Sequence, residues 1–124
     1  MKGDTIKCLF RQAFGAYAGV YTTDENYIYL TTDRYFEKYV LLTDVGVYEV
    51  WAGGYRPKED LELADFRVDD RFYEMSGLLI GGIEAVAEKE LRIQFTNGSY
   101  FEIGLLADYN QFNHPERYMK FTKG

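Results

Sequence analysis

Two alternating apolar segments on either side of Asn97-Gly98 constrain the fold most strongly. Their apolar residues recur at every second position, as in a β-strand; they are Leu91, Ile93 and Phe95 before the turn and Phe101, Ile103 and Leu105 after it. A two-residue loop would put the two apolar rows on opposite faces, because a one-residue change of register reverses every side chain. A three-residue loop over residues 96–98, with Gly98 left-handed, puts both rows on one face. We therefore predict this loop, with Ile93 paired to Phe101.

The rest of the chain predicts further short strands separated by turn residues. Strands are expected over residues 5–12, 16–21, 27–31 and 47–52. Residues 35–42 and 83–87 each fit either a strand or a helix, and a strand is favoured for residues 83–87 because a hairpin follows them. Within the first strand, Ile6, Cys8 and Phe10 are expected on one side. Residues 43–46 predict a turn, and residues 53–57, Gly-Gly-Tyr-Arg-Pro, are the strongest break in the chain.

Two segments predict short helices. Pro57 followed by acidic residues suits a helix start, so residues 58–66 are expected to be helical. Asn113 as a cap, with Glu116 three residues later, predicts a helix over residues 115–121, with an edge strand as the alternative. Residues 69–74 are expected to be loop or irregular edge. The predicted fold is mainly β, with α+β as the alternative: an antiparallel meander sheet, small barrel or sandwich of about six to eight strands with one or two short helices.

The length fits a single domain over residues 1–124, and the aromatic content of 18% favours strands. Cys8 is the only cysteine, so no internal disulfide can form, which predicts a reducing, cytoplasmic location. Lys7 and Arg11 interrupt any signal-peptide core, and the longest uncharged run, residues 12–23, is too short to span a bilayer. We therefore expect no membrane association.

The sequence carries none of the common catalytic or metal-binding patterns. Cys8 and His114 occur once each, which is too few for a tetrahedral zinc site, and no Asp-x-Asp-x-Asp-Gly calcium loop is present. Ser76 and Ser99 lie outside any Gly-x-Ser-x-Gly elbow. The glycine clusters at 53–58 and 77–82 lack the spacing of a phosphate loop. We therefore expect no metal, no cofactor and no catalytic residue, and we expect Cys8 to be buried.

Tyrosines gather on one face of a predicted hairpin around residues 24–25. An odd loop there pairs Tyr21 with Tyr27 and Gly19 with Tyr29, and it separates a tyrosine row from an aliphatic row. The four residues of the tyrosine row are Tyr17, Tyr21, Tyr27 and Tyr29. Tyrosine offers a large rigid area with a polar tip, which suits binding interfaces. The row is predicted to be buried between layers, to form a partner or oligomer interface, or to line a small-ligand pocket.

The net charge of −6 is concentrated in residues 59–74, where seven acidic side chains against Arg67 and Arg71 leave −5. An acidic surface repels phosphate backbones, so nucleic-acid binding is not expected. The segment predicts either a solvated surface or a docking site for a basic protein partner. The acidic residues expected to contact that partner are Asp60, Glu62, Asp65, Asp69 and Asp70.

In size, acidity and aromatic-rich β-meander, the chain resembles bacterial immunity proteins and phage-encoded inhibitors of host defence systems. This resemblance in composition implies a non-catalytic inhibitor that docks on a basic partner, such as a nuclease-type toxin or a defence effector. An alternative is a protein that sequesters a nucleotide-like small molecule on stacked tyrosines, with Arg34 or Arg56 pairing its charge. A third hypothesis is a carboxylate-pair hydrolase. Exposed tyrosine faces also pair in symmetric homo-oligomers, which is compatible with all three hypotheses.

Overall fold

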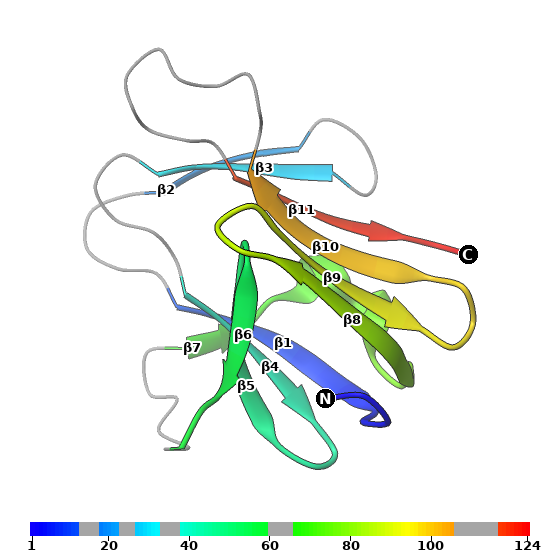
Figure 1. Cartoon of the computed structure of the whole chain (residues 1–124). Helices are drawn as coiled ribbons and strands as arrows, with labels where there is room; N and C mark the ends of the chain where they lie inside the picture. Colours follow the sequence, from blue (N-terminus) through cyan, green and yellow to red (C-terminus); the bar gives the residue numbers. More distant parts are fainter. Residues whose placement is uncertain (13–17, 23–26, 33–37, 60–65, 106–116) are drawn as a thin grey trace.

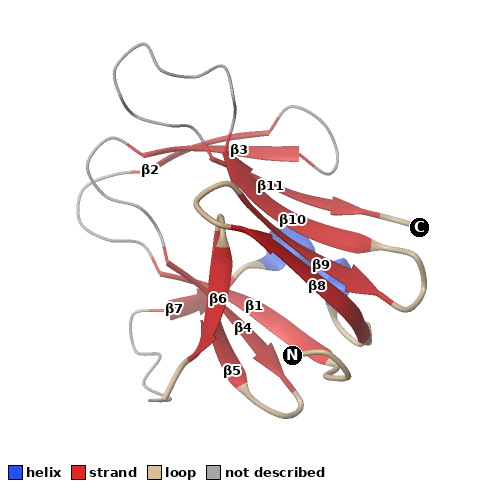
Figure 2. Ribbon diagram, in the orientation of Figure 1, coloured by secondary structure: helices blue, strands red, loops and turns tan. Residues whose placement is uncertain are grey.

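A computed structural model of the chain describes residues 1–12, 18–22, 27–32, 38–59, 66–105 and 117–124; for residues 18–22 and 27–32 it describes the backbone. Eleven strands and one 3₁₀ helix lie in these residues, and the strands form two antiparallel sheets (Figures 1 and 2). The prediction of a mainly β, antiparallel fold is confirmed, although the strands are more numerous than the six to eight expected.

The first sheet has five strands in the order β6-β5-β4-β1-β7. Its strands are β1 Ile6–Gln12, β4 Lys38–Thr43, β5 Val47–Trp51, β6 Gly54–Pro57 and β7 Phe66–Val68. The predicted turn over residues 43–46 joins β4 to β5, and the amide of Thr43 donates to the carbonyl of Gly46 across it. Strands β4, β5 and β6 form a meander, of which only β5 and the turn before it were predicted as such.

The second sheet has six strands in the order β2-β3-β11-β10-β9-β8. Its strands are β2 Ala18–Thr22, β3 Tyr27–Thr32, β8 Ile80–Val86, β9 Glu90–Phe95, β10 Tyr100–Leu105 and β11 Arg117–Thr122. The β9–β10 hairpin is the one predicted. Ile93 pairs with Phe101, and Gly98 has a φ of 90°, which a glycine adopts without strain. The three-residue loop is confirmed.

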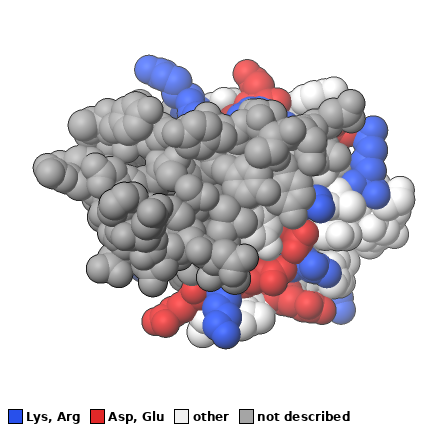
Figure 3. Space-filling model, turned by 90° about the horizontal axis from the view of Figure 1, so that it is seen from above, with Lys and Arg blue, Asp and Glu red and all other residues white. Residues whose placement is uncertain are grey.

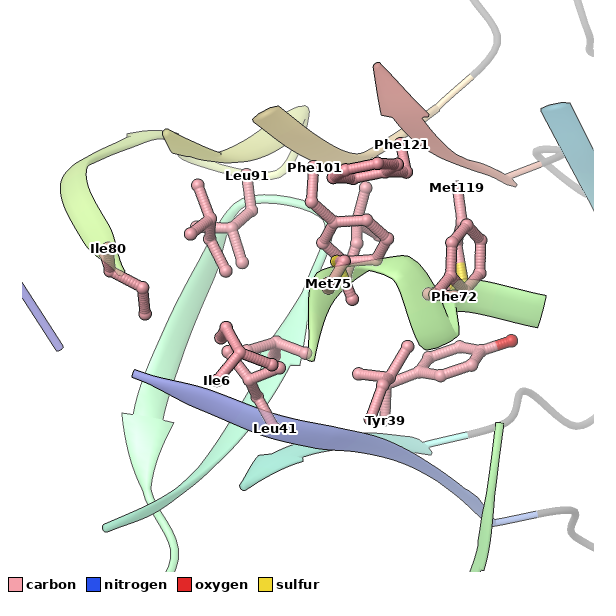
Figure 4. Close-up of a cluster of buried hydrophobic side chains, with 14 of the residues drawn as sticks. Ile6, Tyr39, Leu41, Phe72, Met75, Ile80, Leu91, Phe101, Met119 and Phe121 are labelled. Atoms are coloured by element: carbon pink, nitrogen blue, oxygen red, sulfur yellow. The ribbon is translucent and has the colours of Figure 1, made fainter. Parts of the chain in front are cut away.

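The core lies between the two sheets and contains apolar side chains from both. Leu91, Phe101 and Met119 reach it from the six-stranded sheet, and Leu41 and Tyr39 reach it from the five-stranded sheet (Figure 4). The 3₁₀ helix η1, Asp70–Met75, adds two further side chains between the sheets. These are Phe72 and Met75, and the Phe72 ring meets the Phe101 ring edge to face at 5.1 Å. Burial of this continuous apolar layer fixes which face of each sheet points outward.

The N-terminal segment joins the two sheets at one corner. The amide of Ile6 donates to the carbonyl of Leu78, and the amide of Ile80 donates to the carbonyl of Asp4. The buried Asp4 carboxylate also accepts hydrogen bonds from the hydroxyls of Thr43 and Tyr48, at 2.9 and 3.1 Å. Backbone and side-chain hydrogen bonds thus connect the start of β1 both to β8 and to the β4–β5 hairpin.

The predicted C-terminal helix is corrected, whereas most of the predicted helix over residues 58–66 is not described. Residues 117–122 form β11, which lies between β3 and β10 and is neither a helix nor an edge strand. Met119 and Phe121 of β11 are buried in the core, and the residues that alternate with them are not. Pairing with a strand on each side outweighs the helix-capping signal at Asn113, a residue that lies outside the described part of the chain. Of the predicted helix over residues 58–66, residues 60–65 also lie outside the described part, and Phe66 begins strand β7.

Three local predictions are also corrected. The break predicted at residues 53–57 is wrong, because only residues 52–53 form a turn, with Gly53 at a φ of 117°, and Gly54–Pro57 form strand β6. A register shift between Ile6 and Cys8 in β1 places Ile6 in the core and leaves Cys8 half-buried outside it, so the two do not share a side. Residues 70–75 form η1, where irregular backbone was expected.

Candidate functional site

The face of the six-stranded sheet that points away from the core carries polar and aromatic side chains, and we call it the outer face. It follows from strict alternation: Leu91, Ile93 and Phe95 of β9 are buried in the core, whereas the residues between them are half-buried. The described charged, amide and tyrosine side chains of the outer face are Glu84, Glu90, Arg92, Gln94, Tyr100, Glu102, Tyr118 and Lys120.

A row of charges of alternating sign crosses the outer face. The register places Glu84 opposite Arg92, Arg92 opposite Glu102, and Glu102 opposite Lys120. Arg92 Nη2 donates to Glu102 Oε2 at 2.9 Å, and its guanidinium carbon lies 4.6 Å from the centre of the Tyr100 ring. Opposite charges on neighbouring strands stabilise a sheet face, so these charges largely compensate one another.

Glu90 lies beside this charged row, and the row does not fully offset its negative charge. Arg92 Nε lies 3.6 Å from Glu90 Oε1, but the same guanidinium is already bonded to Glu102. A hydrogen bond with Glu102 and, to a smaller extent, burial raise the pKa of Glu90 above its usual value. The two carboxyl groups therefore lie around one guanidinium, with Glu90 Oε1 3.6 Å from Arg92 Nε and Glu102 Oε2 2.9 Å from Arg92 Nη2.

A second row on the same sheet consists mainly of tyrosine positions. Tyr118 of β11 pairs with Tyr29 of β3, and Tyr29 pairs with Tyr21 of β2, so tyrosines occupy one line across three adjacent strands. Tyr27 pairs with Lys120 and lies at the end of the charged row. The described backbone thus extends the two rows of the outer face into the β2–β3 hairpin.

The register of the β2–β3 hairpin differs by two residues from the one predicted. Tyr21 pairs with Tyr29 rather than with Tyr27, and Gly19 pairs with Thr31 rather than with Tyr29. A shift of two preserves the separation of odd and even positions, so the predicted tyrosine row survives the correction. Tyr17 lies outside the described residues.

Sequence reasoning missed Tyr118 and Tyr100 as members of this surface. Tyr118 was missed because residues 115–121 were predicted to form a helix, whereas Tyr118 lies in strand β11 of the sheet. Tyr100 was placed in its strand, but it has a neighbouring strand on both sides only because β11 continues the sheet beyond β10. The alternation of Tyr118, Lys120 and Thr122 with Met119 and Phe121 is the signal that would have found this strand.

The predicted acidic docking residues do not form one surface in the described part of the chain. Asp69 is buried, with 6% of its surface exposed; it caps η1 and pairs through both carboxylate oxygens with Arg71. Asp70, its neighbour, is exposed. Asp60, Glu62 and Asp65 lie outside the described residues. In the view of Figure 3, acidic and basic side chains of the described residues are interspersed, and neither sign dominates that view.

Other candidate residues have separate surroundings. Arg56, proposed for a nucleotide-like ligand, forms an ion pair with Glu49 at 2.7 Å, and Arg34 lies outside the described residues. Cys8 is half-buried, and burial raises the pKa of its thiol, which makes it a poor nucleophile. Among the residues that the structure describes, no three acidic, cysteine or histidine side chains converge as metal ligands.

Comparisons of the chain with protein-family models, with curated proteins and with solved structures found no match. In the described ranges, no helix has the length and apolar character needed to cross a membrane. The outer face therefore has to be interpreted from its own residues.

Proposed function

We propose that the protein is a non-catalytic binding protein that docks on a basic protein partner through the outer face of the six-stranded sheet. The observation that carries this proposal is the row of tyrosine positions, Tyr21, Tyr29 and Tyr118, which adjoins the stacked pair Arg92 and Tyr100. Tyrosine and arginine contribute most of the binding energy at many protein interfaces, because both offer large contact areas that also form hydrogen bonds.

The balance of charge supports a basic partner. The whole chain carries −6, and on the described outer face the three acids Glu84, Glu90 and Glu102 exceed the two bases Arg92 and Lys120. A negative protein associates faster with a positively charged surface. Nuclease-type toxins and defence effectors carry such surfaces, because they bind phosphate backbones. We propose this class as the partner.

The proposal is tested by measuring binding to a panel of purified nuclease-type toxins and by following inhibition of their nuclease activity. With the toxin that binds, Tyr118→Ala and Glu84→Lys should each weaken affinity at least tenfold. Glu88→Lys is the matched control, because Glu88 is exposed in the β8–β9 turn, outside the outer face. Equal affinities for all three variants would reject the outer face as the docking site. Failure of every toxin to bind would reject the partner class.

Electrostatic steering is tested separately at Asp70. This residue is exposed, whereas Asp69 holds η1 in place, so only Asp70→Lys changes the surface charge without removing a structural contact. We expect Asp70→Lys to slow association more than it speeds dissociation, and we expect wild-type association to slow as salt is raised. Association rates that do not change with salt would contradict the steering.

A further inference from the structure

Two carboxyl groups and one guanidinium meet at the centre of the outer face. Glu102 is nearly enclosed, with 9% of its side chain exposed, and it accepts a hydrogen bond from Arg92. Glu90 lies two residues before Arg92 in β9, opposite Gly104 of β10. Its Oε1 atom is 3.6 Å from Nε of the same guanidinium. A single arginine thus serves two carboxyl groups, one of which has little access to water.

The groups around this cluster add no clear excess of positive charge. Strand β8 contributes Glu84, which accepts from the Gln94 amide at 3.3 Å, and β11 contributes Lys120, which is opposite Glu102 in register. Tyr100 of β10 stacks against Arg92, and the ring of Tyr118 of β11 covers Gly104, the residue opposite Glu90. Two carboxylates held together, one of them desolvated, are costly when both are ionised, and a proton bound between them removes the repulsion.

We propose that Glu90 and Glu102 form a proton-controlled charge switch on the docking face, in which Glu90 holds a proton and donates it in a hydrogen bond to Glu102. Loss of the proton gives the face one more negative charge beside Arg92. The raised pKa of Glu90, caused first by its hydrogen bond with Glu102, agrees with this arrangement. The pair would take up this proton at a higher pH than an ordinary glutamate does.

The consequence for binding rests on the proposed function. A basic partner interacts more favourably with the deprotonated pair than with the protonated one, so binding releases a proton and affinity falls as the pH falls. Glu90→Gln, which mimics the protonated side chain, should weaken binding at neutral pH and abolish most of its dependence on pH. The effect expected for the wild type is at least a threefold loss of affinity between pH 7.5 and pH 5.

The pair is tested first without any partner, by following side-chain carboxyl carbons of the full chain by NMR from pH 3 to pH 8. Glu90 should titrate at a higher pH in the folded protein than in the urea-unfolded chain. Glu102→Gln should remove most of this difference, and the matched variant Glu84→Gln should change it less. Identical titration of Glu90 in the folded and unfolded chains would overturn the proposal, and this wild-type comparison decides the matter even if Glu102→Gln does not fold.

Binding is then measured across the same pH range with the toxin that binds in the preceding test. Weaker binding at pH 5 for the wild type, together with little change for Glu90→Gln, supports the switch. Binding that depends equally on pH in both proteins rejects the switch but leaves the docking face intact. Absence of binding at every pH rejects the proposed function, whereas the NMR titration still decides whether the pair holds a proton.

Discussion

The ring of Tyr118 lies across Gly104, its partner on the neighbouring strand, so that a Cβ atom at position 104 would be 2.5 Å from Cε1 of Tyr118. A glycine opposite an aromatic residue gives the ring room to cover the backbone of the adjacent strand. The glycine–tyrosine pair predicted from the sequence, Gly19 with Tyr29, is absent, and the structure has such a pair at Gly104 and Tyr118. Gly104 therefore sets the position of a tyrosine on the proposed docking face.

Gly104→Ala should displace the Tyr118 ring and reduce the free energy of unfolding by about 1–2 kcal/mol, as expected for an overpacked site. The control is Gly82→Ala, where the added Cβ would meet only the flexible end of Gln94, at 3.1 Å. That variant should change stability by about 0.5 kcal/mol or less. Urea unfolding measures both, and aromatic NMR signals report the ring. Equal stabilities with an unmoved Tyr118 signal would contradict the role given to Gly104.

Two adjacent aspartates should differ sharply in their effect on stability. Asp69 is buried, accepts from the Arg71 amide at the start of η1 and pairs with its guanidinium, whereas Asp70 is exposed. Asp69→Ala should cost about 2–3 kcal/mol, because it removes a cap and leaves Arg71 half-buried without its carboxylate. Asp70→Ala should stay within about 0.5 kcal/mol. Chemical unfolding of the two variants tests this, and similar losses would show that Asp69 is not structural.

The contrast between these aspartates shows which features the sequence can predict. Alternation and turn chemistry are local, so they predicted the β9–β10 hairpin with its three-residue loop at Gly98. Burial of one aspartate of a pair is not local, because it depends on where η1 packs. Charge counting over residues 59–74 therefore gave Asp69 and Asp70 the same role, and the fold gives them different ones.

The tyrosine row shows the same limit. The alternation of odd and even positions predicted which residues of β2 and β3 share a row. A register shift of two residues leaves this alternation unchanged, so it could not predict the register that pairs Tyr21 with Tyr29. Tyr118 joins the row only through pairing between β11 and β3, segments far apart in the chain. Long-range pairing of this kind outweighs a local capping signal, which explains why the C-terminal helix was predicted wrongly.

Asp4 should be the most important residue for attaching the N-terminal segment to the rest of the fold. Its buried carboxylate accepts hydrogen bonds from the hydroxyls of Thr43 and Tyr48. The pKa of Tyr48 is raised, mainly by burial and secondly by this hydrogen bond to Asp4. Asp4→Ala should lower the free energy of unfolding by about 2–4 kcal/mol, since it leaves both hydroxyls without this acceptor.

Asp44→Ala is the matched control for Asp4, because Asp44 also links the N-terminal segment to the β4–β5 hairpin, through an exposed hydrogen bond from the Thr5 amide at 2.8 Å. Its loss should cost less than about 1 kcal/mol. Hydrogen exchange adds a local measurement: the Ile6 and Ile80 amides, which bond across this corner, should lose protection in Asp4→Ala. Unchanged protection at both amides would mean that Asp4 does not hold the corner.

Stability should depend on pH through Glu90. A carboxyl group whose pKa is raised on folding stabilises the folded state fully below the pKa that the group has when unfolded, and this contribution is lost as the pH rises through the folded pKa. Glu90→Gln keeps the hydrogen bond to Glu102 without the charge. The variant should therefore be more stable than the wild type at pH 7, and the difference should vanish near pH 4.

Glu90 is partly exposed, with 35% of its side chain accessible, so solvent screens the repulsion and the gain at pH 7 should be about 0.5 kcal/mol. Urea unfolding at pH 4, 5.5 and 7 measures it, with Glu84→Gln as the control on the same face. The sign is decisive. If Glu90 instead stabilised the fold as a carboxylate paired with Arg92, Glu90→Gln would be less stable than the wild type at pH 7. That result would reject the proposal that Glu90 shares a proton with Glu102.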